Sequence, residues 1–95
     1  LEKSLNQDPN DKKLTKQYIN IAFSAFEWDE VINGIERANK IGVEDDGKYS
    51  LMMGIAYFEK KNLKNSETYF IEASNSKKYA DQGKAWLEYL EALKG

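Results

Sequence analysis

The sequence predicts an all-α protein in which helix pairs follow one another along the chain. Only six glycines and one proline interrupt 95 residues, and such sparse punctuation favours long regular elements. Apolar residues recur at helical spacing, as at Val31, Ile35 and Ala38, whereas no four-residue stretch alternates as a strand would. The same pattern of small and apolar residues returns after 35 residues, which indicates an internal repeat.

Five helices are expected, and most have a recognisable beginning or end. Their expected bounds are 12–26, 29–41, 47–60, 63–74 and 77–93. Side chains able to accept hydrogen bonds from the first N–H groups stand before four of them, at Asp11, Asp45 or Asp46, Asn62 and Ser76. Gly42 follows the second helix, in the position where a left-handed residue closes many helices.

The repeat is clearest in the second half of the chain. Steps of three, nine, four and three residues separate Gly54, Tyr57, Ser66, Phe70 and Ala73. Counting back 35 positions from each gives a degenerate copy made of Ile19, Ala22, Val31, Ile35 and Ala38. Two antiparallel helices approach closely only where one offers a small side chain and the other a ring. We therefore expect Gly54 and Ala73 to make room, and Tyr57 and Phe70 to fill the space.

These spacings resemble those of the tetratricopeptide repeat, whose Gly, Tyr, Ala and Phe recur at the same steps over about 34 residues. The resemblance covers nearly the whole chain and implies a right-handed α-solenoid of antiparallel helix pairs. It divides the chain into the end of a truncated repeat (1–11), two repeats (12–46 and 47–80) and a capping helix (81–95). The run K-S-L-N-Q-D-P-N-D at 3–11 is similar to the end of such a repeat. We therefore expect an N-terminal helical stub, and a C-terminal fragment of a larger bacterial protein.

The last helix is expected to cover the end of the array, because a solenoid must bury the open face of its terminal repeat. Leu87, Leu90 and Ala85 are predicted to face inward, and a neighbouring stripe is formed by Trp86, Tyr89 and Leu93. This stripe is also where a weak homodimer would form. Trp28, near the turn between the first two helices, is predicted to be a packing residue.

The candidate site is the concave groove that the first helices of such repeats line. Counting in register predicts ten residues for it: Lys16, Asn20, Phe23, Lys48, Leu51, Met52, Ile55, Phe58, Trp86 and Tyr89. The helix at 47–60 is apolar almost all round, and such a helix is covered on more than one side. Its stripe of Leu51, Ile55 and Phe58 is predicted to bind an extended or helical peptide. The competing interpretation is that these side chains pack against other parts of the chain.

Some members of the family hold the carboxylate at the end of a partner chain with two Lys, two Asn and one Arg. Lys16 and Asn20 match the first two of these positions. At the other three positions, Met52, Gln82 and Trp86 replace the expected Asn, Lys and Arg. We therefore expect no carboxylate clamp of this kind.

Composition argues against catalysis and against nucleic acid as a partner. The absence of Cys and His removes disulfides, thiolate nucleophiles, imidazole bases and Cys/His metal sites. We expect no enzymatic activity, no catalytic residue, no metal and no cofactor. Fourteen basic side chains against sixteen acidic ones, with Arg37 the only arginine, do not favour a polyanionic partner. No run approaches the roughly 18 apolar residues of a membrane span, so we expect no membrane insertion.

The predicted function is a non-catalytic scaffold that binds a peptide or protein segment in its groove. Two alternatives stay open: a purely structural cap of a longer solenoid, and self-association through the last helix. The runs 47–58 and 83–90 are also similar to the C-terminal ends of bacterial repeat proteins, some of them encoded with TonB energy-transduction systems. Both the cytoplasm and the bacterial periplasm or envelope therefore stay open as compartments.

Overall fold

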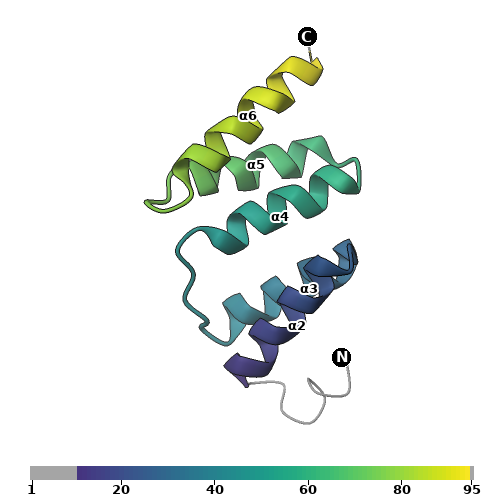
Figure 1. Ribbon diagram of the computed structural model, residues 1–95, viewed down its shortest axis with the longest axis vertical. Coiled ribbons are helices and arrows are strands. Elements are labelled where there is room, and N and C mark those ends of the chain that lie inside the picture. The colour runs from purple at the N-terminus through teal and green to yellow at the C-terminus, as the bar shows by residue number, and fades with distance from the viewer. Residues whose placement is uncertain (1–10, 95) are drawn as a thin grey trace. The chain divides into compact units, whose positions relative to one another are not determined.

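Five helices make up residues 11–94, the part of the chain that the structure describes, and no strand occurs there. In this computed structural model the helices are α2 (Lys12–Ser24), α3 (Trp28–Lys40), α4 (Lys48–Glu59), α5 (Leu63–Ser74) and α6 (Ala80–Lys94) (Figure 1). The predicted all-α class is confirmed, and each helix end lies within three residues of its predicted place. Apart from Asp11, the predicted stub at 1–11 lies outside the described residues.

The chain divides into two compact units between Glu44 and Asp45. The first unit contains α2 and α3, and the second contains α4, α5 and α6. The division falls two residues before the predicted junction between the repeats at 12–46 and 47–80. Within the first unit α2 packs against α3, and within the second unit α5 packs against α4 and α6.

Three of the predicted capping side chains accept hydrogen bonds from the helices that they precede. Asp11 accepts from the N–H three residues further on, at 3.0 Å, and Asn62 does the same at 3.2 Å. Asp45, rather than Asp46, takes this role for α4. Its Oδ1 accepts from the N–H groups two and four residues further on, at 2.8 and 3.0 Å. These bonds satisfy donors that have no partner within the helix.

The last helix begins at Ala80, three residues later than predicted. Ser76 explains the delay, because its Oγ donates to the carbonyl of Ala73 at 2.6 Å and accepts from the N–H of Tyr79 at 3.1 Å. The two bonds hold residues 76–79 in a turn. The N–H of Gly83 then bonds to the carbonyl of Tyr79 at 2.9 Å and begins the helical pattern of α6.

Three helices end in the same way, at a residue with left-handed backbone. These residues are Phe26 (φ 58°), Gly42 (φ 82°) and Lys61 (φ 64°). In each case the N–H of the left-handed residue bonds to the carbonyl three residues earlier. The N–H of the residue that follows it bonds to the carbonyl five residues earlier. These bonds are 2.8 to 3.3 Å long. This is the Schellman arrangement, which glycine favours. Gly42 was predicted for this role, whereas Phe26 and Lys61 adopt the same conformation at a cost of about 1 kcal/mol each.

In the first unit, α2 and α3 pack through the degenerate copy of the repeat. Each of its members is at most 1% exposed: Ile19, Ala22, Val31, Ile35 and Ala38. Gly34 allows the two helices to lie close together, because an added Cβ there would lie 2.8 Å from Cγ1 of Ile19. The small residue therefore lies on the second helix of this pair, and the large one on the first. Tyr18 of α2 also donates a hydrogen bond to the carboxylate of Glu30 on α3.

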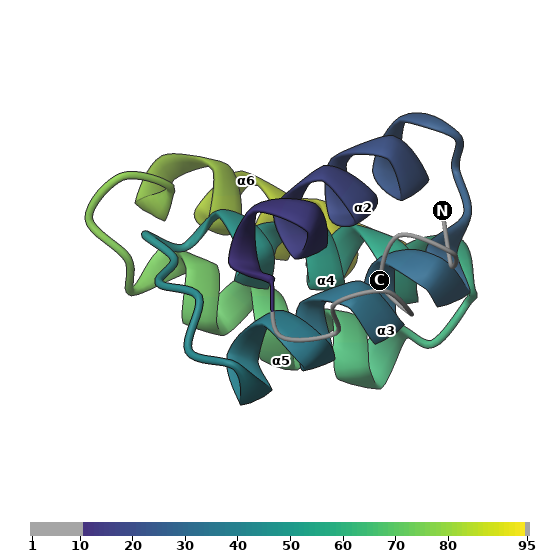
Figure 2. The ribbon, with the colours of Figure 1, turned by 90° about the horizontal axis from the view of Figure 1, so that it is seen from below.

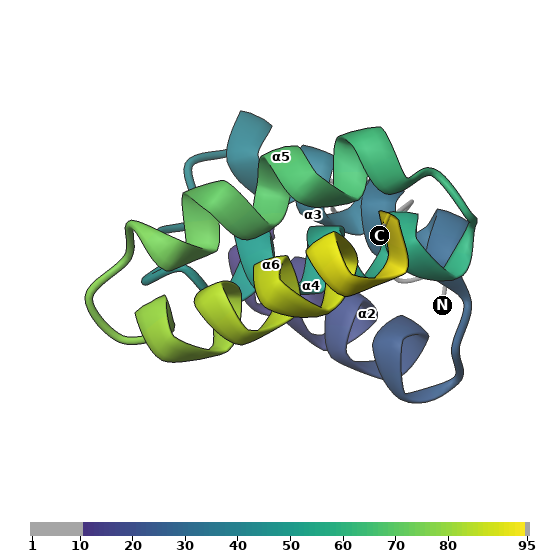
Figure 3. The ribbon, with the colours of Figure 1, turned by 90° about the horizontal axis from the view of Figure 1, so that it is seen from above.

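In the second unit, α5 packs against both α4 and α6 (Figure 1). Gly54 of α4 faces Phe70 of α5, and an added Cβ would lie 2.5 Å from that ring, as the sequence predicted. Ser66 Oγ donates to the carbonyl of Gly54 at 2.7 Å. Gly83 of α6 stands against the backbone of α5, where an added Cβ would lie 2.5 Å from the nitrogen of Ser74. Figure 3 shows α5 and α6 side by side, and the turn that joins them is visible in Figures 2 and 3.

The inward face of α6 differs in part from its prediction. Leu90 is 1% exposed and Leu87 is half-buried, as expected. Ala85 is exposed, and the prediction that it faces inward is wrong. The closest approach is made at Gly83 instead, because there the backbones of α5 and α6 leave no room for a side chain.

Replacing Gly54 with Ala is expected to lower the free energy of unfolding by about 1–3 kcal/mol, because overpacking a closed core forces displacement. The ring of Phe70 cannot swing away easily, since it stacks on Trp86 with centroids 5.0 Å apart. Chemical denaturation of Gly54→Ala measures the loss. In a Phe70→Leu background the same substitution should cost much less; an equal loss in both backgrounds would show that the ring is not the obstacle.

Replacing Lys61 with Gly is expected to raise the free energy of unfolding by about 1 kcal/mol, because glycine adopts positive φ without a steric penalty. Lys60 precedes it in the same turn with φ −83° and provides a matched control. Lys60→Gly should leave stability unchanged or lower. Thermal denaturation of both variants checks the difference, and a lower melting temperature for Lys61→Gly would contradict this account of the turn.

Candidate functional site

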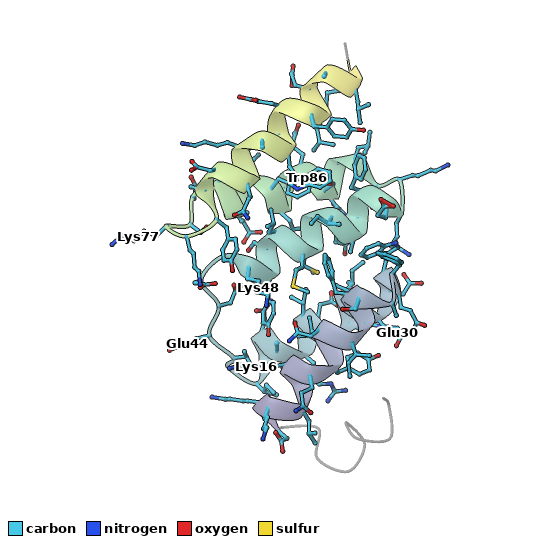
Figure 4. All side chains as sticks on the ribbon, in the orientation of Figure 1. Lys16, Glu30, Glu44, Lys48, Lys77 and Trp86 are labelled. Atoms are coloured by element: carbon cyan, nitrogen blue, oxygen red, sulfur yellow. The ribbon has the colours of Figure 1, made fainter. Side chains whose placement is uncertain are left out.

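Aromatic rings from two helices meet in the second unit. The Phe58 ring of α4 lies 5.3 Å from the Trp86 ring of α6 and 5.7 Å from the Tyr89 ring, centroid to centroid. The latter two rings are 5.9 Å apart and nearly perpendicular, at 82°. Figure 4 shows Trp86 between the ribbons of α4 and α6. Such tilted contacts are the favoured geometry of aromatic pairs.

We call the surface around these rings the α4–α6 face. It consists of Leu51, Ile55 and Phe58 of α4 together with Trp86 and Tyr89 of α6. Tyr89 is 50% exposed, whereas the other four side chains are half-buried. The face therefore presents apolar and aromatic surface while remaining anchored in the unit.

The helix α4 positions its part of the face through its burial pattern. Tyr49, Met53 and Ala56 are buried at steps of four and three residues and share one side of the helix. Leu51 and Ile55 lie on a different side and are half-buried. The sequence prediction of an almost uniformly apolar helix with one partly open stripe agrees with this pattern.

The Trp86 ring packs against the buried core of the second unit. Its ring stacks on that of Phe70, with an interplanar angle of 6° and centroids 5.0 Å apart, and Phe70 is fully buried. The close approach of α6 to α5 at Gly83 permits this stacking. Sequence reasoning missed that role of Gly83, although Gly83 and Trp86 have the same spacing as Gly54 and Tyr57.

The other predicted groove residues do not contribute to the α4–α6 face. Lys16, Asn20 and Phe23 belong to α2 in the first unit; the first two are exposed, and Phe23 is half-buried. The ring of Phe23 packs edge-on against Trp28, at 5.6 Å and 77°. Trp28 thus makes the packing contact predicted for it. In the second unit, Met52 is only 5% exposed, so it contributes little surface to the α4–α6 face.

Two charged side chains stand at the ends of α4. Lys48 is its first residue and Glu59 its last, and both are exposed (Figure 4 labels Lys48). The first turn of this helix contains no acidic residue and the last turn no basic one. The apolar stripe of Leu51 and Ile55 therefore runs between these two exposed side chains.

The resolved pKa shifts do not create a catalytic acid or base near neutral pH. Burial raises the pKa of Tyr49, and the nearby carboxylate of Asp45 raises it further. The hydrogen bond to Glu67 raises the pKa of Lys94, which lies 2.6 Å from that carboxylate. Both groups therefore keep their ordinary neutral-pH states, the phenol neutral and the ammonium charged.

Metal binding and membrane spanning find no support in residues 11–94. Within that range, no group of three acidic, His or Cys side chains is placed to hold a metal ion. None of the described helices combines the length and the apolar character needed to cross a membrane.

Trp86→Ala is expected to lower the free energy of unfolding by about 3–5 kcal/mol, because it removes a large ring from the core contact with Phe70. Tyr89→Ala should cost about 1 kcal/mol, since half of that side chain is already exposed. Urea denaturation of both variants compares them directly. Equal losses would mean that Tyr89, like Trp86, belongs mainly to the core, and that the exposed part of the face is smaller than described.

No known protein family, no curated protein and no solved structure matches this chain. The resemblance to tetratricopeptide repeats therefore depends on the residues and spacings in the sequence.

Proposed function

We propose that the chain is a non-catalytic scaffold that binds a peptide or protein segment, and that the α4–α6 face is its binding surface. The observation that carries this proposal is the cluster of Phe58, Trp86 and Tyr89, in which rings from two helices meet while Tyr89 remains half exposed. Aromatic side chains anchored in this way are typical of the centres of protein interfaces.

The face has the properties that favour binding over simple packing. Its rings are held by neighbouring rings, so little side-chain freedom is lost when a partner covers them. It also offers no imidazole and no thiolate, since neither His nor Cys occurs in the chain. A partner is therefore expected to gain affinity from apolar contact and not to undergo chemistry.

We further propose that the two units are tetratricopeptide-like helix pairs of a right-handed α-solenoid, from a bacterial protein. Supporting this, the repeat residues Gly54 and Phe70 form a close helix contact, and their counterparts 35 positions earlier, Ile19 and Ile35, are buried. In such an array α6 would be the capping helix, as the repeat pattern predicts. A purely structural cap without a ligand is the alternative within the same architecture.

Self-association through α6 is a second candidate function, favoured by one observation. Tyr89 and Leu93 are each 50% exposed and lie four residues apart, so they share a stripe of the helix. Sedimentation equilibrium separates this candidate from peptide binding, because a dimer would show a concentration-dependent mass that Leu93→Lys abolishes.

The proposal is tested by selecting peptides from a random displayed library against the protein. Peptides that bind the α4–α6 face should lose at least tenfold in affinity on Tyr89→Lys, because the new charge would be buried by the partner. The fluorescence of Trp86 should change on binding in a Trp28→Phe background, where it is the sole tryptophan.

Asn65→Lys is the matched control, because it adds the same charge at an exposed position of α5, outside the face. This variant should bind the selected peptides as the wild type does. Circular dichroism must show both variants helical. Selected peptides that bind Tyr89→Lys unchanged would place the binding surface elsewhere, and failure to select any peptide would favour the structural cap.

A further inference from the structure

The turn between α2 and α3 exposes an aromatic ring. Phe26 is 72% exposed, whereas every other large apolar side chain in the described part of the chain is at most 50% exposed. Its ring contacts that of Trp28, with centroids 5.8 Å apart and an interplanar angle of 46°. This contact covers only a small part of Phe26. Most of an apolar ring therefore stands in water, which costs free energy.

The backbone at Phe26 is also unfavourable for this residue type. Its φ of 58° lies in the left-handed region, which bulky side chains rarely adopt and in which glycine is preferred. Gly42 has the same role at the end of α3, with φ 82°. Phe26 therefore improves neither the turn nor the core of the first unit. Residues that break a local rule without a local gain are expected where a position has a functional role.

A third ring lies at the same turn. Phe23 packs edge-on against Trp28, with centroids 5.6 Å apart, and both side chains are half-buried. Trp28 thus contacts both phenylalanines, and its partial burial fixes its position in the unit. We call the surface formed by Phe23, Phe26, Glu27 and Trp28 the α2–α3 turn surface.

The charged residues near this turn are all of one sign. Between positions 17 and 36 the chain has four acidic residues and no basic one; the acidic residues are Glu27, Asp29, Glu30 and Glu36. The basic residues in the described part of the first unit lie at the helix ends remote from the turn. They belong to the first five residues of α2 and the last four of α3. Within residues 11–44, the turn is therefore negatively charged.

The helix dipoles do not neutralise this charge. The C-terminus of α2 and the N-terminus of α3 meet at the turn, and their partial charges have opposite signs. The last turn of α2 contains no basic residue, whereas the first turn of α3 contains Asp29 and Glu30. The dipole of α3 favours these carboxylates, and the unpaired end of α2 offsets that effect. The carboxylates therefore leave the turn negative.

Glu27 is the carboxylate best placed to meet a partner. It lies between Phe26 and Trp28 in the sequence, and it is exposed. Its side chain does not cap α3, and it has no ion pair within residues 11–44. By contrast, Glu30, which Figure 4 labels, accepts a hydrogen bond from Tyr18. A partner can therefore bond to Glu27 without breaking an existing contact.

The exposed ring and the carboxylate together select the chemistry of the partner. An apolar segment would bury Glu27 without a partner, and a polyanion would be repelled. A cation suits both groups, because it pairs with a carboxylate and is attracted to the face of an aromatic ring. The planar guanidinium of arginine does both at once, since it stacks on a ring while its N–H groups bond to a carboxylate. The ammonium of lysine is more strongly hydrated and cannot stack.

We propose that the α2–α3 turn surface binds an arginine side chain of a partner protein, with the guanidinium stacked on the ring of Phe26 and bonded to the carboxylate of Glu27. This surface shares no residue with the α4–α6 face, so the inference goes beyond the proposed function and is tested separately. Phe23 and Trp28 provide apolar contact for the residues on either side of the arginine.

Three tripeptides with blocked ends test this proposal: Leu-Arg-Leu, Leu-Lys-Leu and Leu-citrulline-Leu. Citrulline has the shape of arginine but no charge. In NMR titrations of the isotope-labelled protein, the arginine tripeptide should bind with a Kd on the order of 1 mM. The other two should bind about fivefold more weakly. Shifts are expected at the amides of residues 25–28 and at the indole of Trp28, while the indole of Trp86 stays unchanged.

Two variants assign the binding to the ring and to the carboxylate. Phe26→Gly should weaken the arginine tripeptide about threefold. Its melting temperature should be unchanged or higher, because glycine adopts positive φ without strain, so loss of folding cannot produce this result. Glu27→Gln should weaken the arginine tripeptide about threefold and leave the citrulline tripeptide unaffected. Glu36→Gln is the matched control, because it removes the same charge from an exposed position of α3 remote from the rings. It should bind as the wild type does.

The remaining outcomes overturn the proposal. If the lysine or the citrulline tripeptide binds as tightly as the arginine tripeptide, the surface does not select a guanidinium. If Glu36→Gln weakens binding as much as Glu27→Gln, binding follows net charge alone. If no tripeptide binds, or if the shifts fall on the Trp86 indole instead of that of Trp28, the turn surface is not an arginine site. These results leave the proposed function of the α4–α6 face unchanged.

Discussion

The second unit depends on the position of one ring, that of Phe70. It is fully buried on α5, it leaves no room for a side chain at Gly54 of α4, and it stacks on Trp86 of α6. Because α5 contacts both neighbours through this residue, the placement of α4 and the placement of α6 are coupled. The α4–α6 face exists only because the two helices are brought to the same ring.

The turns at the ends of the helices also help to fix where the next helix lies. Only three residues, Lys60 to Asn62, separate α4 from α5, and a left-handed residue lets the chain reverse while its carbonyls stay bonded. A glycine would adopt this conformation more easily than Lys61 does. The strain is tolerated because the packing around Gly54 and Phe70 fixes where α5 must lie.

Features that depend on neighbours in the sequence could be predicted, whereas features that depend on tertiary contacts could not. Helix positions and caps such as Asp11 and Asn62 were predicted correctly, because they depend on neighbours in the sequence. The burial of the repeat positions followed from their regular spacing. The role of Gly34 was not predicted, because it depends on which side chain of α2 lies opposite. The same holds for Gly83, whose importance comes from the backbone of α5 and not from its own surroundings in the sequence.

The candidate site shows the same limit. Phe58, Trp86 and Tyr89 were predicted to share a surface, and their ring contacts place them together. Helical spacing alone could not separate Met52, which is buried, from Leu51 beside it, which is partly open. One position along a helix changes the direction of a side chain by about 100°, so the identity of the covering element decides exposure. That information is tertiary and has no local signal.

The apolar side chains and the terminal charges of α4 contribute differently to the second unit. The rings and aliphatic side chains form the apolar part of the α4–α6 face, and contact of that kind is tolerant of sequence and of direction. Lys48 and Glu59 are exposed, and exposed charges contribute little free energy. Their opposition to the helix dipole is offset by the Asp45 carboxylate that caps the start of α4 and by Lys60 and Lys61, which follow its end. The stability of α4 therefore depends on its cap and on its apolar contacts with α5, and little on the signs of the charges at its two ends.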